Sequence, residues 1–196
     1  KFGVPLSLSN LKKNIDYGVF EIGMDKKGEI NNLSKMVKPE IAIITNIGGA
    51  HFKNFSSLKD IARAKAEIID NVLEGGSIIL NKDDKFFSFL SNIAKKKGIS
   101  VTSFSSMKKA DVSLLSKIKI KNQYKLKIIV KNKIFYFNIS QGTNNFVNNI
   151  LACISILSVL NLDINKMKKR FANFSLPHGR GDIKVVKKFK KKFKFI

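Results

Sequence analysis

The sequence predicts an α/β protein with a mostly parallel sheet flanked by helices and a smaller antiparallel region. In roughly the first half of the chain, short apolar runs alternate with amphipathic helical patterns, the rhythm of a parallel sheet. A central stretch instead alternates apolar and polar residues in closely spaced runs, which is typical of antiparallel strands. The 196 residues, 44% hydrophobic and 26% charged, suffice for one sizeable globular domain.

The parallel region is expected to alternate strands and helices from residue 17 to residue 104. Pro39 ends its first helix and Gly75-Gly76 its second. Ser57 is expected to cap the second helix, with Asp60 three positions on in a capping-box arrangement. The expected strands are 17–22, 41–47, 77–81 and 101–104, and the expected helices are 30–37, 57–73 and 86–97.

The antiparallel region is expected to follow directly. A Lys-Asn-Lys turn at 131–133 separates two of its strands. Two helices then return the chain to a helical pattern, and a further strand pair begins at Val185. The expected strands are 112–120, 125–130 and 134–139, and the expected helices are 145–160 and 164–174.

The charge balance is unusual, because 37 basic and 14 acidic residues give a formal net charge of +23. Only Arg63, Arg170 and Arg180 are arginines, and the lysines are spread along the whole chain. Nucleic-acid binders concentrate basic residues on one face and favour arginine for bidentate contacts. A lysine-rich coding bias is therefore favoured over a nucleic-acid-binding module, which stays as the alternative from another functional class.

Two other features of composition bear on function. No run of about 18 apolar residues occurs, so we expect no membrane span. The single cysteine, Cys153, has no partner for an internal disulfide, which fits a reducing compartment.

Glu21 and His51 are placed at the carboxyl ends of two expected strands. Ligands of open α/β sheets bind in the crevice outside such ends. A carboxylate and an imidazole there can share a divalent metal. Taken singly, a solvated strand end explains Glu21 equally well, and an ordinary loop histidine explains His51. Their equivalent positions favour the site interpretation.

Lys65 completes the apolar stripe of the 57–73 helix. Lysine is common in this chain and can extend its stem along an apolar surface, so a structural role is a substantial alternative. If the amine is buried, its pKa falls, and the neutral amine can capture carbon dioxide as a carbamate, an anionic metal ligand. The residues alone leave both interpretations open.

A series of segments, in order over essentially the whole chain, resembles the Mur ligases. Glu-Ile-Gly-Met at 21–24 and Gly-Glu-Ile at 28–30 favour the branch that adds D-alanyl-D-alanine to a peptidoglycan precursor. The segment 61–68 resembles the one that carries the carbamoylated lysine of the family, and 142–148 resembles its adenine-contacting turn and helix start. The remaining matching segments are 3–6, 45–47, 50–51, 55–57, 80–84 and 176–181.

The resemblance implies an ATP- and Mg²⁺-dependent ligase that activates a carboxylate as an acyl phosphate, which an amine then attacks. Both metals neutralise the developing phosphate charge. Lys65 and His51 would be the catalytic residues. The implied site comprises Glu21 for the magnesium that bridges the ATP phosphates, His51 and carbamoylated Lys65 for the second magnesium, Asn145 and Asn148 for adenine, and Arg180 for the ribose or phosphates.

The sequence departs from the family in two ways. Asn144 occupies the position of the usual histidine before the first adenine-site asparagine, and no G-x-x-x-x-G-K-[ST] phosphate loop occurs in the chain. We therefore expect 1–182 to be the middle, ATP-binding domain, incomplete at its amino terminus. We expect 183–196 to begin a strand pair that leads to a carboxyl-terminal domain.

The expected partners follow from the same resemblance. They are UDP-MurNAc-peptide and D-Ala-D-Ala, bound largely through domains outside this chain, so the chain alone is not expected to ligate. We expect a cytoplasmic monomer with no specific nucleic-acid partner. Another Mur ligase or a folylpolyglutamate synthase-like ligase is the alternative within the enzymes.

Overall fold

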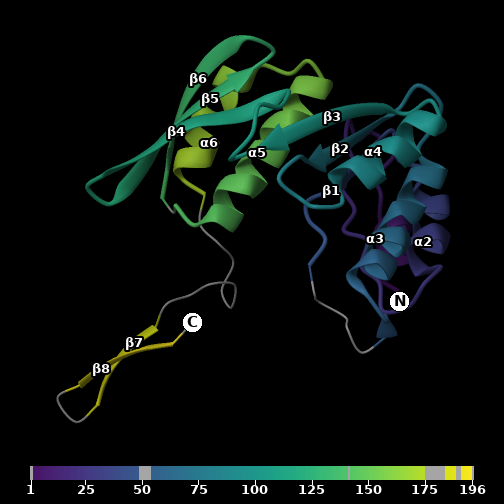
Figure 1. Cartoon of the computed structure of the whole chain (residues 1–196), viewed down its shortest axis with the longest axis horizontal. Helices are drawn as coiled ribbons and strands as arrows, with labels where there is room; N and C mark the ends of the chain where they lie inside the picture. The colour runs from purple at the N-terminus through teal and green to yellow at the C-terminus, as the bar shows by residue number, and fades with distance from the viewer. Residues whose placement is uncertain (1, 49–53, 141, 175–183, 189–190, 196) are drawn as a thin grey trace.

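The computed structural model describes residues 2–48, 54–140 and 142–174, together with the backbone of 184–188 and 191–195. A six-stranded sheet in the order β1-β2-β3-β4-β5-β6 runs through the molecule (Figure 1). Its strands are β1 (Ile41–Ile44), β2 (Ser77–Asn81), β3 (Ser100–Ser105), β4 (Val112–Ile120), β5 (Gln123–Val130) and β6 (Lys133–Ile139).

The sheet changes from parallel to antiparallel at β4. β1, β2 and β3 pair in parallel, and β4 joins β3 in parallel only through its first residues, Val112 and Ser113. The rest of β4 pairs antiparallel with β5, and β5 with β6. The turn between β5 and β6 places Lys131 and Asn132 at φ 45° and 68°, the left-handed region used by tight hairpin turns. The predicted mixed sheet is confirmed.

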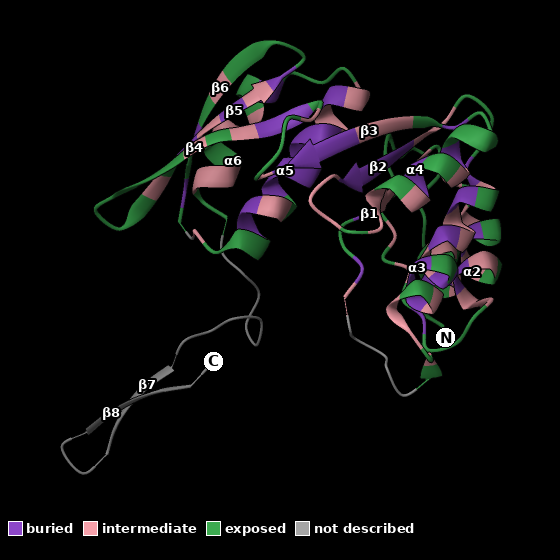
Figure 2. Cartoon of the chain, viewed as in Figure 1, coloured by how far each residue is buried: buried purple, intermediate pink, exposed green. Residues whose placement is uncertain are grey.

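Helices cover both faces of the sheet. α2, α3 and α4 pack on one face against buried residues such as Ala42 and Leu80, whereas α5 packs on the other face against Ile79 and Phe104 (Figure 2). Leu80 and Ile79 are neighbours, so the alternation of a strand sends them to opposite layers. The helices are α1 (Gly3–Ser9), α2 (Glu29–Val37), α3 (Leu58–Ala66), η2 (Glu67–Asn71), α4 (Phe87–Lys96), α5 (Asn144–Val159), η3 (Ile164–Met167) and α6 (Lys168–Ala172).

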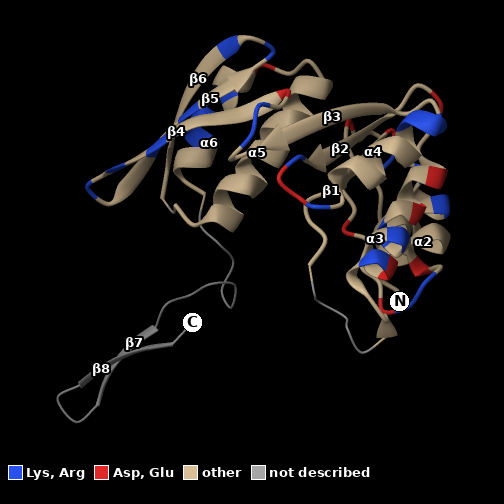
Figure 3. Cartoon of the chain, in the orientation of Figure 1, with Lys and Arg blue, Asp and Glu red and all other residues tan. Residues whose placement is uncertain are grey.

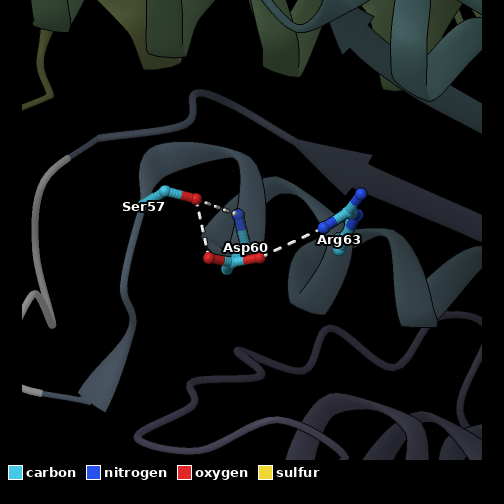
Figure 4. Close-up of polar contacts among 3 residues, drawn as sticks. All are labelled: Ser57, Asp60 and Arg63. Carbon is cyan, nitrogen blue, oxygen red and sulfur yellow. Dashed lines mark hydrogen bonds and ion pairs between the residues drawn. The ribbon is translucent and has the colours of Figure 1, made fainter.

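The start of α3 follows the capping prediction. The backbone N–H of Asp60 donates to the Ser57 hydroxyl oxygen at 3.2 Å, and that hydroxyl donates to the Asp60 carboxylate at 2.7 Å (Figure 4). Asp60 also accepts from exposed Arg63 at 3.2 Å. The first contact satisfies one of the backbone N–H groups that a helix start leaves unpaired. The Asp60 carboxylate bonds the Ser57 hydroxyl and not the Ser57 backbone N–H, so the N-cap is confirmed but the reciprocal bond of a capping box is replaced by this side-chain contact.

The expected single helix over 57–73 is wrong in its second half, because α3 gives way to the 3-10 helix η2 at Glu67. Glu67 accepts hydrogen bonds from the backbone N–H groups of Gly28 at 2.8 Å and Asn31 at 3.1 Å, at the start of α2. The Asn71 side chain donates to Asn31 Oδ1 and to Ser34 Oγ, both at 2.9 Å. The tightened turn thus carries the side chains that attach it to α2.

The expected first strand, at 17–22, is also wrong, because this segment is irregular. Tyr17 is 59% exposed and Val19 95% exposed. Among the described strands β1 pairs only with β2, so the 17–22 segment has no ladder partner there. An extended segment without a partner gains no inter-strand hydrogen bonds, which explains why the apolar run alone does not make a strand.

The other predicted elements correspond to helices or strands of the structure, with shifted bounds at several ends. The last helical pattern is divided into η3 and α6, and the strand pair expected from Val185 is present as β7 (Lys184–Lys188) and β8 (Lys191–Phe195), paired antiparallel. Among the described residues, no helix combines the length and apolar character that crossing a bilayer requires.

Candidate active site

The side chain of Lys65 lies at the carboxyl end of β1. Lys65 is in the last turn of α3, and its Nζ donates a hydrogen bond to the backbone carbonyl of Asn46 at 2.9 Å. Asn46 follows β1 by two residues, where the chain leaves the sheet earlier than the expected strand end at 47. Burial lowers the pKa of the half-buried Lys65 amine, and the negative charge of Asp84 partly opposes that shift.

Asp84 joins the ends of β1 and β2. Its Oδ2 accepts a hydrogen bond from the backbone N–H of Ile47 at 2.6 Å, and its Oδ1 accepts one from Phe86 N at 2.8 Å. The carbonyl of Asn46 and the N–H of Ile47 belong to one planar peptide group. Lys65 therefore donates to one side of this group, and Asp84 accepts from the other.

Asp83 joins the ends of β2 and β3 in the same manner. Its Oδ1 accepts from the Ser105 hydroxyl at 2.5 Å, and its Oδ2 accepts from Ser106 N at 2.7 Å. The Asn81 side chain accepts from Asp83 N at 2.9 Å. The 80–84 segment was matched to the family without a role for either aspartate. The sequence feature that could have indicated their role is the pair of adjacent carboxylates directly after a buried strand.

Glu21 is not on a strand in the structure. It is exposed in the irregular segment before α2 and lines an open cavity of about 510 Å³. The described lining of this cavity does not include Lys65, and its residues are Gly3, Val4, Glu21, Gly23, Met24, Asp25, Glu29, Asn32 and Leu33. The expected pairing of Glu21 with a strand end is thus not seen, and its role as a metal ligand stays a prediction.

The second expected metal ligand, His51, lies outside the described residues, as does Arg180. Within the part of the chain that the structure describes, no three His, Cys, Asp or Glu side chains gather closely enough to hold a metal ion. Of the two residues expected to hold the second magnesium, Lys65 is the one that the structure describes. Its half-buried amine fits the chemistry of a carbamate, because a lowered pKa increases the neutral, nucleophilic fraction.

The expected adenine-contacting segment forms the start of α5. Thr143 caps this helix by accepting from Phe146 N at 3.4 Å. Asn145 is exposed in the first turn. Asn148 lies one turn further, and its Oδ1 is buried without a hydrogen-bond partner among the described atoms. A buried carboxamide oxygen without a partner is costly, so this atom is an available acceptor for a ligand donor such as an exocyclic amine.

The turn before α5 is fixed by contacts with the antiparallel strands. Lys117 of β4 donates to the carbonyl of Gly142 at 2.8 Å and to Asn144 Oδ1 at 3.4 Å. A Cβ built on Gly142 would lie 2.5 Å from Cε1 of Tyr124, so a larger residue there requires the ring to move. The residue that replaces the usual histidine of the family, Asn144, thus has a partner on β4 that the sequence did not reveal.

The basic residues of the described chain are not confined to one end of the molecule (Figure 3). Lysines and arginines occur on the helices near the amino terminus and along the antiparallel strands at the other end of the molecule (Figure 3). The absence of a nucleic-acid partner stays a prediction.

The parallel strands of the sheet end beside a half-buried lysine of α3 and two hydrogen-bonded aspartates. This is the architecture of open α/β domains, a class in which ligands bind at the carboxyl ends of the strands. The chain belongs to the Mur ligase family, because residues 1–157 match its profile, described as the Mur ligase middle domain.

Two relatives that match almost the whole chain carry the same activity name. The UDP-N-acetylmuramoyl-tripeptide--D-alanyl-D-alanine ligase of Rickettsia prowazekii is 32% identical over 182 residues, which cover 92% of this chain and 40% of that protein. The enzyme of the same name from Buchnera aphidicola (subspecies Baizongia pistaciae) is 32% identical over 190 residues, 96% of this chain and 40% of that protein. The chain thus spans about two fifths of the length of these relatives.

Solved structures of MurF ligases have the same fold as this chain. A crystal structure of MurF from Acinetobacter baumannii superposes with a TM-score of 0.85 at 26% identity, over 97% of this chain and 41% of that one. The MurF ligase of Thermotoga maritima, solved in complex with ADP, has a TM-score of 0.75 at 22% identity, which shows the fold alone, over 96% of this chain and 42% of that one.

Proposed function

We propose that this chain is the nucleotide-handling part of an ATP-dependent ligase that joins D-Ala-D-Ala to UDP-MurNAc-tripeptide. The observation that carries the proposal is the Lys65 amine at the carboxyl end of β1, within a chain whose relatives bear that ligase name. Other Mur ligases and folylpolyglutamate synthase have the same architecture and are the alternative. The identity to the D-alanyl-D-alanine ligases favours the first assignment.

We propose the following residue roles. Carbamoylated Lys65 and His51 would hold one magnesium ion, and Glu21 the other. When bound, the two ions neutralise the charge that develops on the transferred phosphate. Asn145 and Asn148 would contact adenine, and Arg180 the ribose or phosphates. The buried, unpaired Oδ1 of Asn148 supports the adenine role, because the amino group of adenine is a donor.

The carbamate would form on the neutral amine of Lys65. The nitrogen bonds to the carbon of carbon dioxide, one C=O bond becomes the C–O⁻ of the carbamate, and the nitrogen releases one proton to solvent, so that a neutral amine becomes an anion. Burial favours this step, because it lowers the pKa of the amine. The ammonium form of Lys65 must lose a first proton to give that neutral amine, so two protons leave in all between the cation and the carbamate anion.

We further propose that residues 1–182 form the middle domain and that 183–196 lead toward a further domain. The peptide substrate and the dipeptide would be bound largely by the rest of the protein. A cytoplasmic monomer fits this proposal, because the nucleotide-linked precursor and ATP are both cytoplasmic metabolites.

The experiment is an ADP-release assay with UDP-MurNAc-tripeptide, D-Ala-D-Ala, ATP and Mg²⁺, on the protein that contains this chain. We expect ADP release that requires both acceptor and donor, and a loss of at least about a hundredfold in Lys65→Ala. Lys59→Ala, on the exposed side of the same helix, is the control and should keep its rate. If ADP is not released in a substrate-dependent manner, the proposed function is refuted. Full activity in Lys65→Ala would refute the role of Lys65.

A further inference from the structure

The two oxygens of the Asp84 carboxylate serve two different segments. Oδ1 accepts from Phe86 N, two residues ahead, and so shapes the turn that leads into α4. Oδ2 accepts from Ile47 N at 2.6 Å, across the sheet edge on the loop that follows β1. This second bond is short for an N–H donor.

The bond to Ile47 also determines the direction of the Asn46 carbonyl. The peptide group is planar and resists rotation, so holding its N–H fixes its oxygen on the opposite side. That oxygen is the acceptor for Lys65 Nζ. The lysine stem has several rotatable bonds and considerable rotamer entropy, and this carbonyl is the anchor that selects one orientation.

We propose that Asp84 is a positioning residue for Lys65, acting through the Asn46–Ile47 peptide group. Asp84 holds the peptide, the peptide presents its carbonyl, and the carbonyl orients the lysine at the carboxyl end of β1. The functional meaning of this arrangement rests on the proposed function, in which Lys65 is the reactive amine. The positional statement concerns four residues of this chain and needs neither nucleotide nor metal to be tested.

Asp83 provides a matched control one residue away. It is also half-buried, and both of its oxygens accept hydrogen bonds. Its partners, Ser105 and Ser106, are on β3 and the turn after it, on the side of β2 away from β1. Asp83→Asn and Asp84→Asn each remove one negative charge and one acceptor oxygen. The first change affects the contact with β3, and the second affects the contact with the loop after β1.

The experiment compares wild type, Asp83→Asn, Asp84→Asn and Asp84→Ser in the full 196-residue chain. The serine variant keeps a hydroxyl that can cap the turn before α4 but is too short to reach Ile47, so it serves if the asparagine variant folds poorly. The first readout is amide hydrogen exchange at Ile47 and at Ser106. The second is the NMR signal of the Lys65 ε-methylene in lysine-labelled protein, assigned by its loss in Lys65→Met.

In both Asp84 variants we expect exchange at Ile47 to rise by about tenfold, since one charge-assisted hydrogen bond is lost. We also expect the Lys65 ε-signal to shift toward the cluster of exposed lysines. Asp83→Asn should speed exchange at Ser106 and leave the Lys65 signal in place. An unmoved Lys65 signal in both Asp84 variants, or the same shift in Asp83→Asn, would overturn the inference. The hydrogen-exchange and NMR measurements contain no substrate, so they do not depend on ligation. A failure of the separate ligation assay would refute the proposed function and leave the positioning role of Asp84 unaffected.

Discussion

Lys65 and Asp84 bind opposite sides of a single peptide group. The Lys65 ammonium donates to the Asn46 carbonyl at 2.9 Å, and the Asp84 carboxylate accepts from the adjoining Ile47 N–H at 2.6 Å. The two side chains come from α3 and from the segment after β2, so the contact ties a helix and two strand ends together. This arrangement brings a lysine of lowered pKa to the edge of the sheet where open α/β domains bind ligands.

The lowered pKa of Lys65 predicts a specific pH dependence of stability. The folded protein releases this proton at lower pH than the unfolded chain, whose ordinary value is 10.5. The unfolded state therefore binds more protons in the window between the lowered pKa and 10.5, and the contribution of Lys65 to stability rises with pH across it. Urea unfolding over this window should show that slope in wild type and lose it in Lys65→Met. An identical slope in the variant would contradict the burial of the amine.

Ser57→Ala should destabilise the protein by about 1 kcal/mol at neutral pH, because it removes the cap of α3. The hydrogen bond from Ser57 is the main cause of the lowered pKa of Asp60; desolvation partly opposes it, and contacts with Arg63 lower the pKa further. A carboxyl with a depressed folded-state pKa adds stability above its ordinary pKa of 3.8 and loses it as pH falls through the depressed value. The difference in free energy of unfolding between wild type and Ser57→Ala, measured with urea, should therefore become smaller below about pH 3.8. A constant difference across that range would argue against the Ser57–Asp60 bond.

Glu67→Gln should lower the free energy of unfolding by about 1–2 kcal/mol. The Glu67 carboxylate accepts from two backbone N–H groups at the start of α2, where a negative charge is also favoured by the helix dipole. Glutamine has one acceptor oxygen and no charge, so it replaces only part of this interaction. The measurement is urea denaturation, with exposed Glu74→Gln as the control. Equal changes in the free energy of unfolding for Glu67→Gln and Glu74→Gln would show that the Glu67 contacts do not stabilise the start of α2.

Gly142→Ala should lower the free energy of unfolding by about 1–3 kcal/mol, because the added methyl would lie 2.5 Å from the Tyr124 ring. The clash is with a side chain, so Tyr124→Ser should relieve it. A double-mutant cycle measured by thermal unfolding tests this coupling. Additive effects of the two substitutions would show that the ring does not confine the turn before α5.

Much of the fold could be predicted from the sequence because most elements have local signals. Apolar runs located β2, and the Ser57–Asp60 spacing located the start of α3. The segment at 17–22 has the same apolar character as β2, but a strand also needs a neighbour, and pairing is a property of the whole sheet. The 3-10 turn at Glu67 was missed for a similar reason, since it is stabilised by contacts with α2 that are distant in sequence.

The site was predictable to a smaller extent. The helical stripe placed Lys65 on the buried side of α3, and the structure confirms that it is half-buried. Its contact with Asn46 and the role of Asp84 depend on the crossing of a helix over two strand ends, which no local pattern encodes. Lys117 and Tyr124, which fix the turn before α5, lie on strands that look purely structural in the sequence.

The most direct test of the central claim is a ligation reaction that offers several amines at once. The protein that contains this chain would receive UDP-MurNAc-tripeptide, ATP, Mg²⁺ and equal amounts of D-Ala-D-Ala, D-glutamate and L-lysine, and the products would be identified by mass. We predict one product, the precursor extended by D-Ala-D-Ala, formed together with an equal amount of ADP. Extension by another amine, or no ATP-dependent product at all, would contradict the assignment.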